Sequence, residues 1–265
     1  MKSCIGLGLI LVAVFCVTTA DEYEDTPVCT GETKRLMEQR FRPSHLSYQE
    51  PDVPTLKATF SMGCFWGVES VFGALPGVIR VKVGYTGGIK ENPTYESLDD
   101  HTESVEIEFD PERITYASLL ETFWANHNPS DLKPVQYMSA IFYHDYIQMK
   151  SAEDSKLNQR RVLGEDTLTK IKRAKVFYDA EDYHQKYFLR QHANFVQSLG
   201  LTDQDFLSSW RATKLLGYIT GNGDEQNLKQ EKDALGLTDD HMSYLAAARK
   251  SGKEGRCSAA KKDEL

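Results

Sequence analysis

The sequence is poor in positive charge, in cysteine and in long hydrophobic runs. Of its 265 residues, 31 are Lys or Arg and 39 are Asp or Glu, which leaves a formal net charge of −8. No positive field would attract phosphates, so nucleic acid is not an expected partner. Five cysteines are too few for a fold built from disulfides. The 40% hydrophobic content is that of an ordinary globular chain, and it excludes a wholly disordered or multispanning protein.

The longest apolar run occupies residues 4–17, after Lys2 and before the small residues at 18–20. This order of basic, apolar and small residues is typical of a secretory signal peptide. A membrane anchor is the alternative reading, but the run is shorter than the roughly 20 residues that a spanning helix needs. We therefore expect residues 1–20 to be a signal peptide.

The last four residues are Lys262-Asp263-Glu264-Leu265. KDEL at a C-terminus is a retrieval signal that a receptor reads for the endoplasmic reticulum. Such a signal is useful only to a protein that has entered the secretory pathway, so the two ends support each other. The sequence predicts a resident of the endoplasmic reticulum lumen that the KDEL receptor retrieves.

Removal of the signal peptide would leave three cysteines, Cys29, Cys64 and Cys257. Because three is odd, at least one thiol stays outside any intramolecular disulfide. No Cys-x-x-Cys occurs, which weighs against a thioredoxin-type disulfide exchanger. The seven histidines show neither HExxH nor Cys/His ligand spacing, so we expect no metal site.

Hydrophobic patterning predicts a mixed α+β fold rather than strict alternation of strand and helix. Strands are expected at 56–62, 78–85, around 105–109, at 138–143 and at 175–178. Helices are expected around 68–75, around 119–127, from the mid-140s to about 163, and at 181–198. We divide the mature chain into an extended lead-in at 21–54, a core domain at 55–198 and a helical C-terminal extension at 199–261.

Cys64 follows an expected strand and begins an expected helix. Free N–H groups and the positive dipole end at a helix N-terminus favour the thiolate, so this placement predicts a lowered pKa and a nucleophilic sulfur. A small buried core cysteine is the alternative that placement alone leaves open.

Glu103 lies two residues before the alternating strand at 105–109. If that strand extends back, Glu103 shares a face with Val105, Ile107 and Phe109. Burial there would raise the pKa of the carboxyl and let it act as a general acid near neutral pH. A residue at the rim of a strand end is the alternative.

Gly63-Cys64-Phe65-Trp66-Gly67 resembles the GCFWG signature of the A-type methionine sulfoxide reductases. Further family motifs follow in the family's order over about residues 56–190. They are Gly77-Val78, Gly84-Tyr85-Thr86-Gly87-Gly88, Asn92-Pro93-Thr94-Tyr95, His101-Thr102-Glu103, Asp110-Pro111, Phe123-Trp124, Asn126-His127 and Ala180-Glu181-Asp182-Tyr183-His184-Gln185.

The resemblance implies a two-layer mixed-sheet sandwich with a ferredoxin-like core, and a site at the start of its first core helix. It implies that Cys64 attacks the sulfur of methionine S-sulfoxide and that Glu103 donates a proton to the oxygen. The products are methionine and a sulfenic acid on Cys64, which a second thiol converts to a disulfide.

The same resemblance implies how the substrate is held. Tyr95 and Tyr137 would hydrogen-bond the sulfoxide oxygen, while Phe65 and Trp66 would hold the ε-methyl group. It implies no metal and no organic cofactor. His184 is interpreted as structural rather than catalytic.

Two departures from the family stand out. The family's G-N-D-x-G-T-Q-Y-R-S stretch is several residues shorter here, over 128–139. Gln136, Tyr137 and Ser139 are retained, so Tyr137 is carried over, whereas Asp131 is a poor counterpart of the motif's aspartate.

The family's Gly-Tyr-Cys-Gly motif is absent, so the candidates to resolve the sulfenic acid are Cys257 and Cys29. Cys257 is favoured because it lies in a basic tail that we expect to be flexible and able to fold back on the site. Two unpaired thiols, or a disulfide between Cys29 and Cys257, are the alternatives.

We expect an oxidoreductase that repairs oxidised methionine in proteins under oxidative stress, with the free amino acid as a further candidate substrate. Thioredoxin is the usual reductant of the family, so a thioredoxin-like protein or another lumenal dithiol is the expected partner. The alternative is a lumenal quality-control module that binds methionine-containing or oxidised clients without turnover, which the shortened loop before Tyr137 motivates.

Overall fold

The computed structural model describes Tyr48 and residues 50–260, and of 251–260 it describes the backbone alone. The predictions for the signal peptide at 1–20, for Cys29 and for the terminal KDEL lie outside the described residues. Within them, no helix combines the length and the apolar character needed to cross a bilayer.

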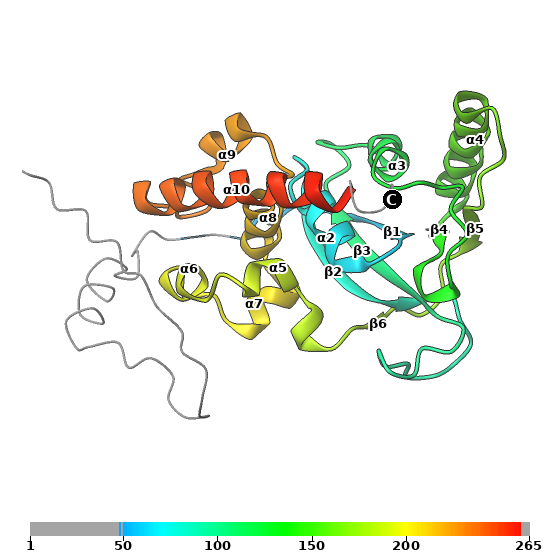
Figure 1. Ribbon diagram of the computed structural model, residues 1–265, viewed down its shortest axis with the longest axis horizontal. Helices are drawn as coiled ribbons and strands as arrows, with labels where there is room; N and C mark the ends of the chain where they lie inside the picture. The colour runs from blue at the N-terminus through cyan, green and yellow to red at the C-terminus, as the bar shows by residue number, and fades with distance from the viewer. Residues whose placement is uncertain (1–47, 49, 261–265) are drawn as a thin grey trace, which may run out of the picture. The chain divides into compact units, whose positions relative to one another are not determined.

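A six-stranded sheet forms the centre of the described chain (Figure 1). Its strands are β1 Leu56–Met62, β2 Val78–Thr86, β3 Thr102–Phe109, β4 Ser139–Tyr143, β5 Lys170–Arg173 and β6 Tyr178–Asp179. They follow in the order β5-β4-β1-β3-β2-β6, with β4 and β5 parallel and the other neighbours antiparallel. The predicted mixed α+β fold is confirmed.

Three helices accompany these strands, and others follow them. The first are α2 Phe65–Gly73, α3 Tyr116–Ala125 and α4 Tyr146–Leu163. The 3-10 turn η1 Val135–Tyr137 lies between α3 and β4, and the 3-10 turn η2 Asp182–His184 follows β6. The later helices are α5 Tyr187–Arg190, α6 Ala193–Ser198, α7 Asp203–Ser208, α8 Trp210–Ile219, α9 Glu225–Glu231 and α10 Asp239–Ala260.

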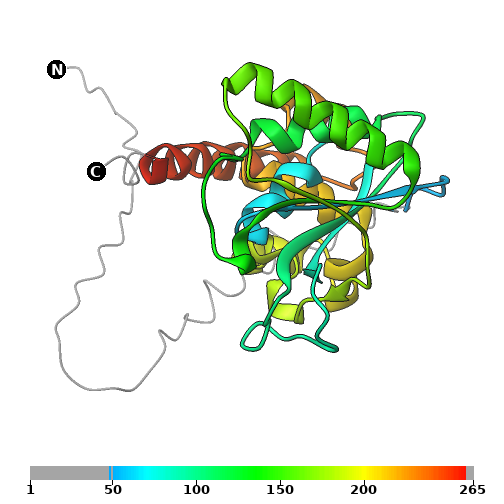
Figure 2. The ribbon, with the colours of Figure 1, turned by 90° about the vertical axis from the view of Figure 1, so that its right-hand side faces the viewer.

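The apolar face of the sheet packs against α2 and α3. Alternate residues of β1, β2 and β3 join Phe72 of α2 and Phe123 of α3 in one buried cluster, in which Phe60 contacts both rings. The opposite face is polar, with Lys57 and Lys82 both paired to Glu106. Helix α4 runs beside α3 on the apolar side (Figure 2). This alternation is what a sheet with one covered face requires.

Two predicted elements are wrong, and tertiary contacts explain both. The strand expected at 175–178 is replaced by β5 and β6, because the chain pairs with β4 and then with β2 at different points. The helix expected over 181–198 is split into η2, α5 and α6. Gln185 leaves the helical path to bond both the N–H and the carbonyl of Val83 on β2, and Lys186 then adopts a left-handed backbone with φ of 52°.

Helix α8 packs directly on the helix that begins at Cys64. Every residue of α8 is buried, and it contacts α2, β2 and α10. A Cβ atom built on Gly73 would lie 2.5 Å from the carbonyl oxygen of Thr213, and one on Gly217 would lie 2.4 Å from the backbone nitrogen of Ala74. The two backbones therefore touch at both glycines, which fixes α8 and its neighbours against α2.

A buried ion pair ties α2 to the chain that returns along its side. Lys186 Nζ lies 2.8 Å from Glu69 Oε1, and both side chains are 0% exposed. The same ammonium donates to the carbonyls of Val81 on β2 and Phe206 on α7. The Lys186 N–H donates to Glu69 Oε2 at 2.9 Å. The Glu69 carboxylate therefore binds both the backbone and the side chain of Lys186, a residue with a left-handed backbone conformation.

Glu69→Ala should destabilise the protein strongly, because it leaves the Lys186 ammonium buried without its counter-charge. Breaking a buried pair of this kind costs about 3–5 kcal/mol in the free energy of unfolding. Urea denaturation followed by tryptophan fluorescence would measure the loss. Glu225→Ala, which breaks the solvent-exposed pair with Lys229, is the matched control and should leave the midpoint nearly unchanged. Equal midpoints for both variants would contradict the assignment.

Candidate active site

Cys64 forms the N-cap of α2, directly after β1, and its side chain is exposed. Although Cys64 is exposed, the protein around its sulfur shields it partly from water; this desolvation raises the pKa of the thiol, and the nearby Glu103 carboxylate raises it further. The backbone N–H groups of Trp66 and Gly67 at the helix start lower it, as the sequence led us to expect, but their effect is the smaller one. The predicted net lowering of the pKa is therefore wrong.

Glu103 occupies the second position of β3, on the same face as Val105, and is 1% exposed. Its Oε2 accepts the N–H of Phe65 at 3.0 Å, and its Oε1 accepts Gln136 Nε2 at 2.9 Å. Burial raises the pKa of the carboxyl, even though both hydrogen bonds favour the ionised form. This direction agrees with the sequence-based expectation.

The side chains of Tyr95 and Tyr137 lie next to each other near Cys64 and Glu103. Their side chains are hydrogen-bonded to each other, and this bond is the largest cause that raises the pKa of Tyr137, with smaller contributions from Glu103 and Cys64. The Tyr137 hydroxyl also accepts Gln136 Nε2 at 3.1 Å. The structure thus brings together two hydroxyls, one carboxyl and one thiol that lie apart in the sequence.

Phe65 and Trp66 lie beside Cys64 but in different surroundings. Phe65 is 1% exposed and packs against Tyr85 and His184. Trp66 is half-buried and stacks on Tyr187, with a centroid distance of 3.7 Å and an interplanar angle of 4°. Trp66 therefore offers an indole face at the surface of the site, while Phe65 supports it from the core.

Comparison with known proteins assigns these residues to a family. The family model for peptide methionine sulfoxide reductase matches residues 56–212. A peptide methionine sulfoxide reductase of Drosophila melanogaster is 42% identical over 229 residues, which cover 85% of this chain and 90% of that protein. The chain belongs to the peptide methionine sulfoxide reductase family. As a member it is an oxidoreductase that acts on sulfur groups, with methionine sulfoxide as its substrate.

Two solved structures are also similar to the chain. Methionine sulfoxide reductase A of Corynebacterium diphtheriae is 28% identical, with a TM-score of 0.49, covering 57% of this chain and 82% of that one. Mxr1 of Saccharomyces cerevisiae, in a complex with Trx2, is 25% identical, with a TM-score of 0.40, covering 53% of this chain and 89% of that one.

Two residues of this reductase that were interpreted as structural, or not considered, reach the site. His184 Nδ1 accepts Trp66 Nε1–H at 3.0 Å, and the His184 ring lies 4.8 Å from the Tyr95 ring. Because Nδ1 is the acceptor, the proton of a neutral ring is on Nε2, and burial lowers the pKa of His184. Glu181 Oε1 accepts the Tyr95 N–H at 3.0 Å. The motif at 180–185 was the signal available in the sequence.

The remaining candidates contribute little that can be described. Cys257 lies in α10, where the backbone is helical rather than the flexible tail that was expected, and its side chain lies outside the described residues. Asp131 is engaged with Asn128 and Lys133. Within the described part of the chain, no three His, Cys, Asp or Glu side chains come close enough to hold a metal ion.

Glu103→Gln should lower the pKa of Cys64, since it removes a negative charge that opposes the thiolate. Thiolate forms as pH rises, so the midpoint of Cys64 alkylation by iodoacetamide should move to lower pH in the variant. Mass spectrometry of the Cys64 peptide reads this thiol apart from Cys29 and Cys257. Glu96→Gln, which neutralises an exposed carboxylate next to Tyr95, should leave the midpoint in place. A midpoint that moves upward in Glu103→Gln would contradict the electrostatic coupling.

Proposed function

We propose that this reductase acts on the S epimer of methionine sulfoxide, in proteins and as the free amino acid, through a sulfenic acid on Cys64. The observation that carries the proposal is the pairing of an exposed thiol with a buried carboxyl of raised pKa. One group is a soft nucleophile and the other retains a proton at higher pH than an ordinary glutamate. The reaction needs both.

In the proposed step the Cys64 thiolate attacks the sulfoxide sulfur and forms a bond between the two sulfurs, while the oxygen takes up two protons and leaves as water when the S–O bond breaks. A water molecule then attacks the Cys64 sulfur, the bond between the two sulfurs breaks, and methionine leaves with that electron pair. Cys64 is left as a sulfenic acid and one proton is released. The methionine sulfur gains two electrons and the cysteine sulfur loses two. Glu103 is the proposed proton donor, because a sulfoxide oxygen is a poor leaving group until it is protonated.

The environment of Glu103 supports this assignment. The Phe65 N–H and Gln136 Nε2 hold its two oxygens, so the carboxyl has a fixed orientation. Tyr95 and Tyr137 are proposed to donate hydrogen bonds to the sulfoxide oxygen, since their hydroxyls meet beside Glu103. Phe65 and Trp66 are proposed to hold the ε-methyl group, with the half-buried indole of Trp66 in direct contact.

Recycling requires a second thiol, which attacks the sulfenic acid and releases water as a disulfide forms. Cys257 is the proposed resolving residue and Cys29 the second candidate. A dithiol protein of the thioredoxin type is proposed to reduce the disulfide, taking the oxidation onto its own cysteines. The ordinary chemistry of the family supports this order of steps.

We also propose that the enzyme works in the lumen of the endoplasmic reticulum. The composition of residues 1–20 and the terminal Lys262-Asp263-Glu264-Leu265 support a signal peptide and retrieval by the KDEL receptor.

The strand order β4-β1-β3-β2, with all neighbours antiparallel, supports the ferredoxin-like description of the core.

Cys64→Ser should abolish reduction, and Glu103→Gln should lower kcat by about a hundredfold or more, since general acid catalysis contributes a factor of this order. The assay is mass spectrometry of an oxidised methionyl peptide with dithiothreitol, in which one epimer loses one oxygen atom. Glu96→Gln serves as the control. Turnover that persists in Cys64→Ser would refute the mechanism, and a wild-type protein that binds the peptide without changing its mass would instead be the binding module.

Cys257→Ser should slow turnover driven by a thioredoxin-type protein far more than turnover driven by dithiothreitol. The reason is that a small dithiol can reduce the Cys64 sulfenic acid directly, whereas a protein reductant acts on a disulfide. Cys29→Ser is the matched variant. If only Cys29→Ser shows this selective loss, Cys29 is the resolving residue, and if neither does, the sulfenic acid is recycled directly.

A further inference from the structure

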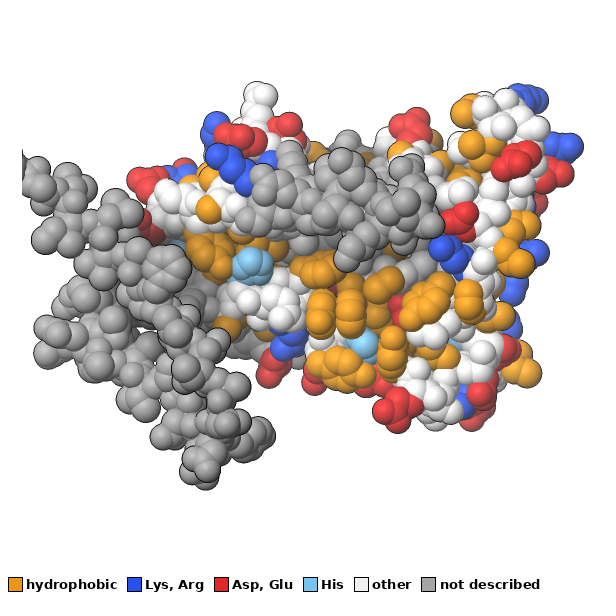
Figure 3. All heavy atoms as spheres, in the orientation of Figure 1, with side chains coloured by type: hydrophobic (Ala, Val, Ile, Leu, Met, Phe, Trp, Pro, Cys, Tyr) orange, Lys and Arg blue, Asp and Glu red, His pale blue; other side chains and the backbone are white. Residues whose placement is uncertain are grey.

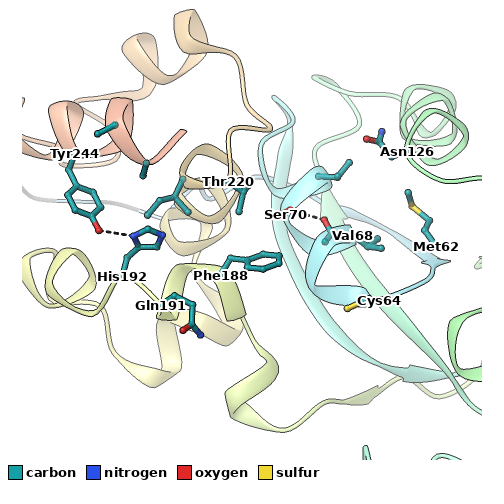
Figure 4. Close-up of a pocket in the computed structure, with 15 residues that line it drawn as sticks. Met62, Cys64, Val68, Ser70, Asn126, Phe188, Gln191, His192, Thr220 and Tyr244 are labelled. Atoms are coloured by element: carbon teal, nitrogen blue, oxygen red, sulfur yellow. Dashed lines mark hydrogen bonds between the residues drawn. The ribbon is translucent and has the colours of Figure 1, made fainter. Parts of the chain in front are cut away.

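A groove of about 800 Å³ opens on the side of Cys64 where the C-terminal helices pack. One wall is built by α2, and the other wall is built by α5, α8 and α10 (Figure 4). It is separate from the cluster of Glu103, Tyr95 and Tyr137, none of which lines it. Cys64 lines the groove and also interacts electrostatically with Glu103 and Tyr137, so it belongs to both.

The α2 wall follows from helical spacing. Cys64, Val68 and Val71 are separated by four and three residues, so they project from one face of the helix. Phe188 of α5, Ile219 of α8 and Ala247 of α10 line the opposite wall. In Figure 4 the Phe188 ring points from α5 toward α2. An apolar path therefore leads away from the reacting sulfur between two walls.

The groove lacks charge along its described lining. None of its fifteen described lining residues is Asp, Glu, Lys or Arg. Its titratable residues are Cys64, His192 and Tyr244. Burial lowers the pKa of the His192 ring, and its Nδ1 is hydrogen-bonded to the Tyr244 hydroxyl at 2.7 Å. Figure 3 shows hydrophobic side chains gathered on the same face, where α5 and α2 lie in Figure 1. A charged ligand would lose its hydration here without gaining a counter-charge.

The groove is larger than the amino acid substrate requires. Methionine sulfoxide has about ten non-hydrogen atoms and occupies at most roughly 300 Å³, even at the volume of a water molecule for each atom. Part of that molecule, its oxidised side chain, would be held on the other side of Cys64. Most of the groove therefore remains for something that is joined to the substrate.

We propose that this groove binds the polypeptide adjoining the oxidised methionine, and that it selects an uncharged apolar side chain next to that residue. The inference rests on the proposed reduction of methionine sulfoxide within proteins and adds a substrate class to it.

Continuity with Cys64 favours a substrate over the other occupants. A peptide whose sulfoxide reaches the thiol must continue past it, and that thiol is itself part of the groove lining. A folded dithiol protein is far larger than 800 Å³ and could reach only the rim. Binding of the protein reductant in the groove is the alternative that the test distinguishes.

The test compares Ala247→Trp, which fills the groove from an exposed position on α10, with Ala246→Trp. The adjacent Ala246 is also exposed but does not line the groove. The substrates are N-acetylmethionine S-sulfoxide and blocked tripeptides with leucine, or with aspartate, on both sides of methionine S-sulfoxide. Dithiothreitol is the reductant, and kcat/KM is measured for each.

The wild type should prefer the leucine tripeptide over the aspartate tripeptide by about tenfold or more, since burial of one aliphatic side chain is worth a factor of this order. In Ala247→Trp, the ratio of kcat/KM for the leucine tripeptide to that for N-acetylmethionine S-sulfoxide should fall about tenfold. Ala246→Trp should keep the wild-type ratio. An unchanged ratio in Ala247→Trp would overturn the proposal.

Gln191→Glu provides a second test in which the fold is not at risk, because Gln191 is exposed and lines the groove. The added negative charge should further reduce kcat/KM for the aspartate tripeptide relative to the leucine tripeptide. A loss in either variant that appears only with a thioredoxin-type protein, and not with dithiothreitol, would assign the groove to the reductant. If the wild type reduces N-acetylmethionine S-sulfoxide and both tripeptides equally well, the proposed function stands and the groove proposal fails. If it reduces none of them, the proposed function fails.

Discussion

The buried pair of Glu69 and Lys186 determines how the rest of the molecule surrounds Cys64. Glu69 lies on α2, one turn after Cys64, and Lys186 is held in a left-handed conformation by its two bonds to that carboxylate. A charge buried this deeply tolerates little displacement, because its alternative is an unpaired ion in a poorly solvated core. The residues next to Lys186 are therefore positioned as firmly as α2 itself.

Both neighbours of Lys186 extend this constraint to the site. Gln185 bonds to β2 through Val83, and Tyr187 stacks on Trp66. His184 receives the Trp66 N–H and lies against Tyr95. On its far side the Lys186 ammonium reaches the Phe206 carbonyl of α7. One ion pair thus links the indole beside Cys64 to the helices that follow α5.

Desolvation affects both the Cys64 thiol and the Glu103 carboxyl, and the charge of Glu103 acts on the thiol as well. Burial raises the pKa of Glu103 and of Cys64, and the charge of Glu103 raises the pKa of Cys64 again. Each group is therefore more readily neutral than in water, and ionisation of one makes ionisation of the other harder. When the Cys64 thiolate attacks, it loses its negative charge, and the sulfoxide oxygen takes the proton that Glu103 holds. This arrangement suits a reaction that needs an acid and a nucleophile together.

Local sequence patterns were sufficient for the central elements. The alternation around Val105 placed β3 and put Glu103 on the apolar face, and helical spacing located α2 and α3, because these signals depend on neighbours a few residues away. The strand at 175–178 was predicted wrongly because the chain there pairs with β4 and then with β2 at other points. The helix over 181–198 was predicted wrongly because Gln185 and Lys186 bond to partners on β2, α2 and α7. Propensity carries no information about contacts of that range.

The sequence by itself determined which groups carry the chemistry: the thiol in Gly63-Cys64-Phe65-Trp66-Gly67, the carboxyl of Glu103 and the family to which the motifs point. Only the tertiary structure decided the direction of the Cys64 pKa, because burial and the charge of a residue 39 positions away outweigh the local helix start. It alone also placed α5, α8 and α10 across from α2 and so formed the groove beside Cys64. Burial and long-range proximity are properties of the assembled chain, and no local pattern encodes them.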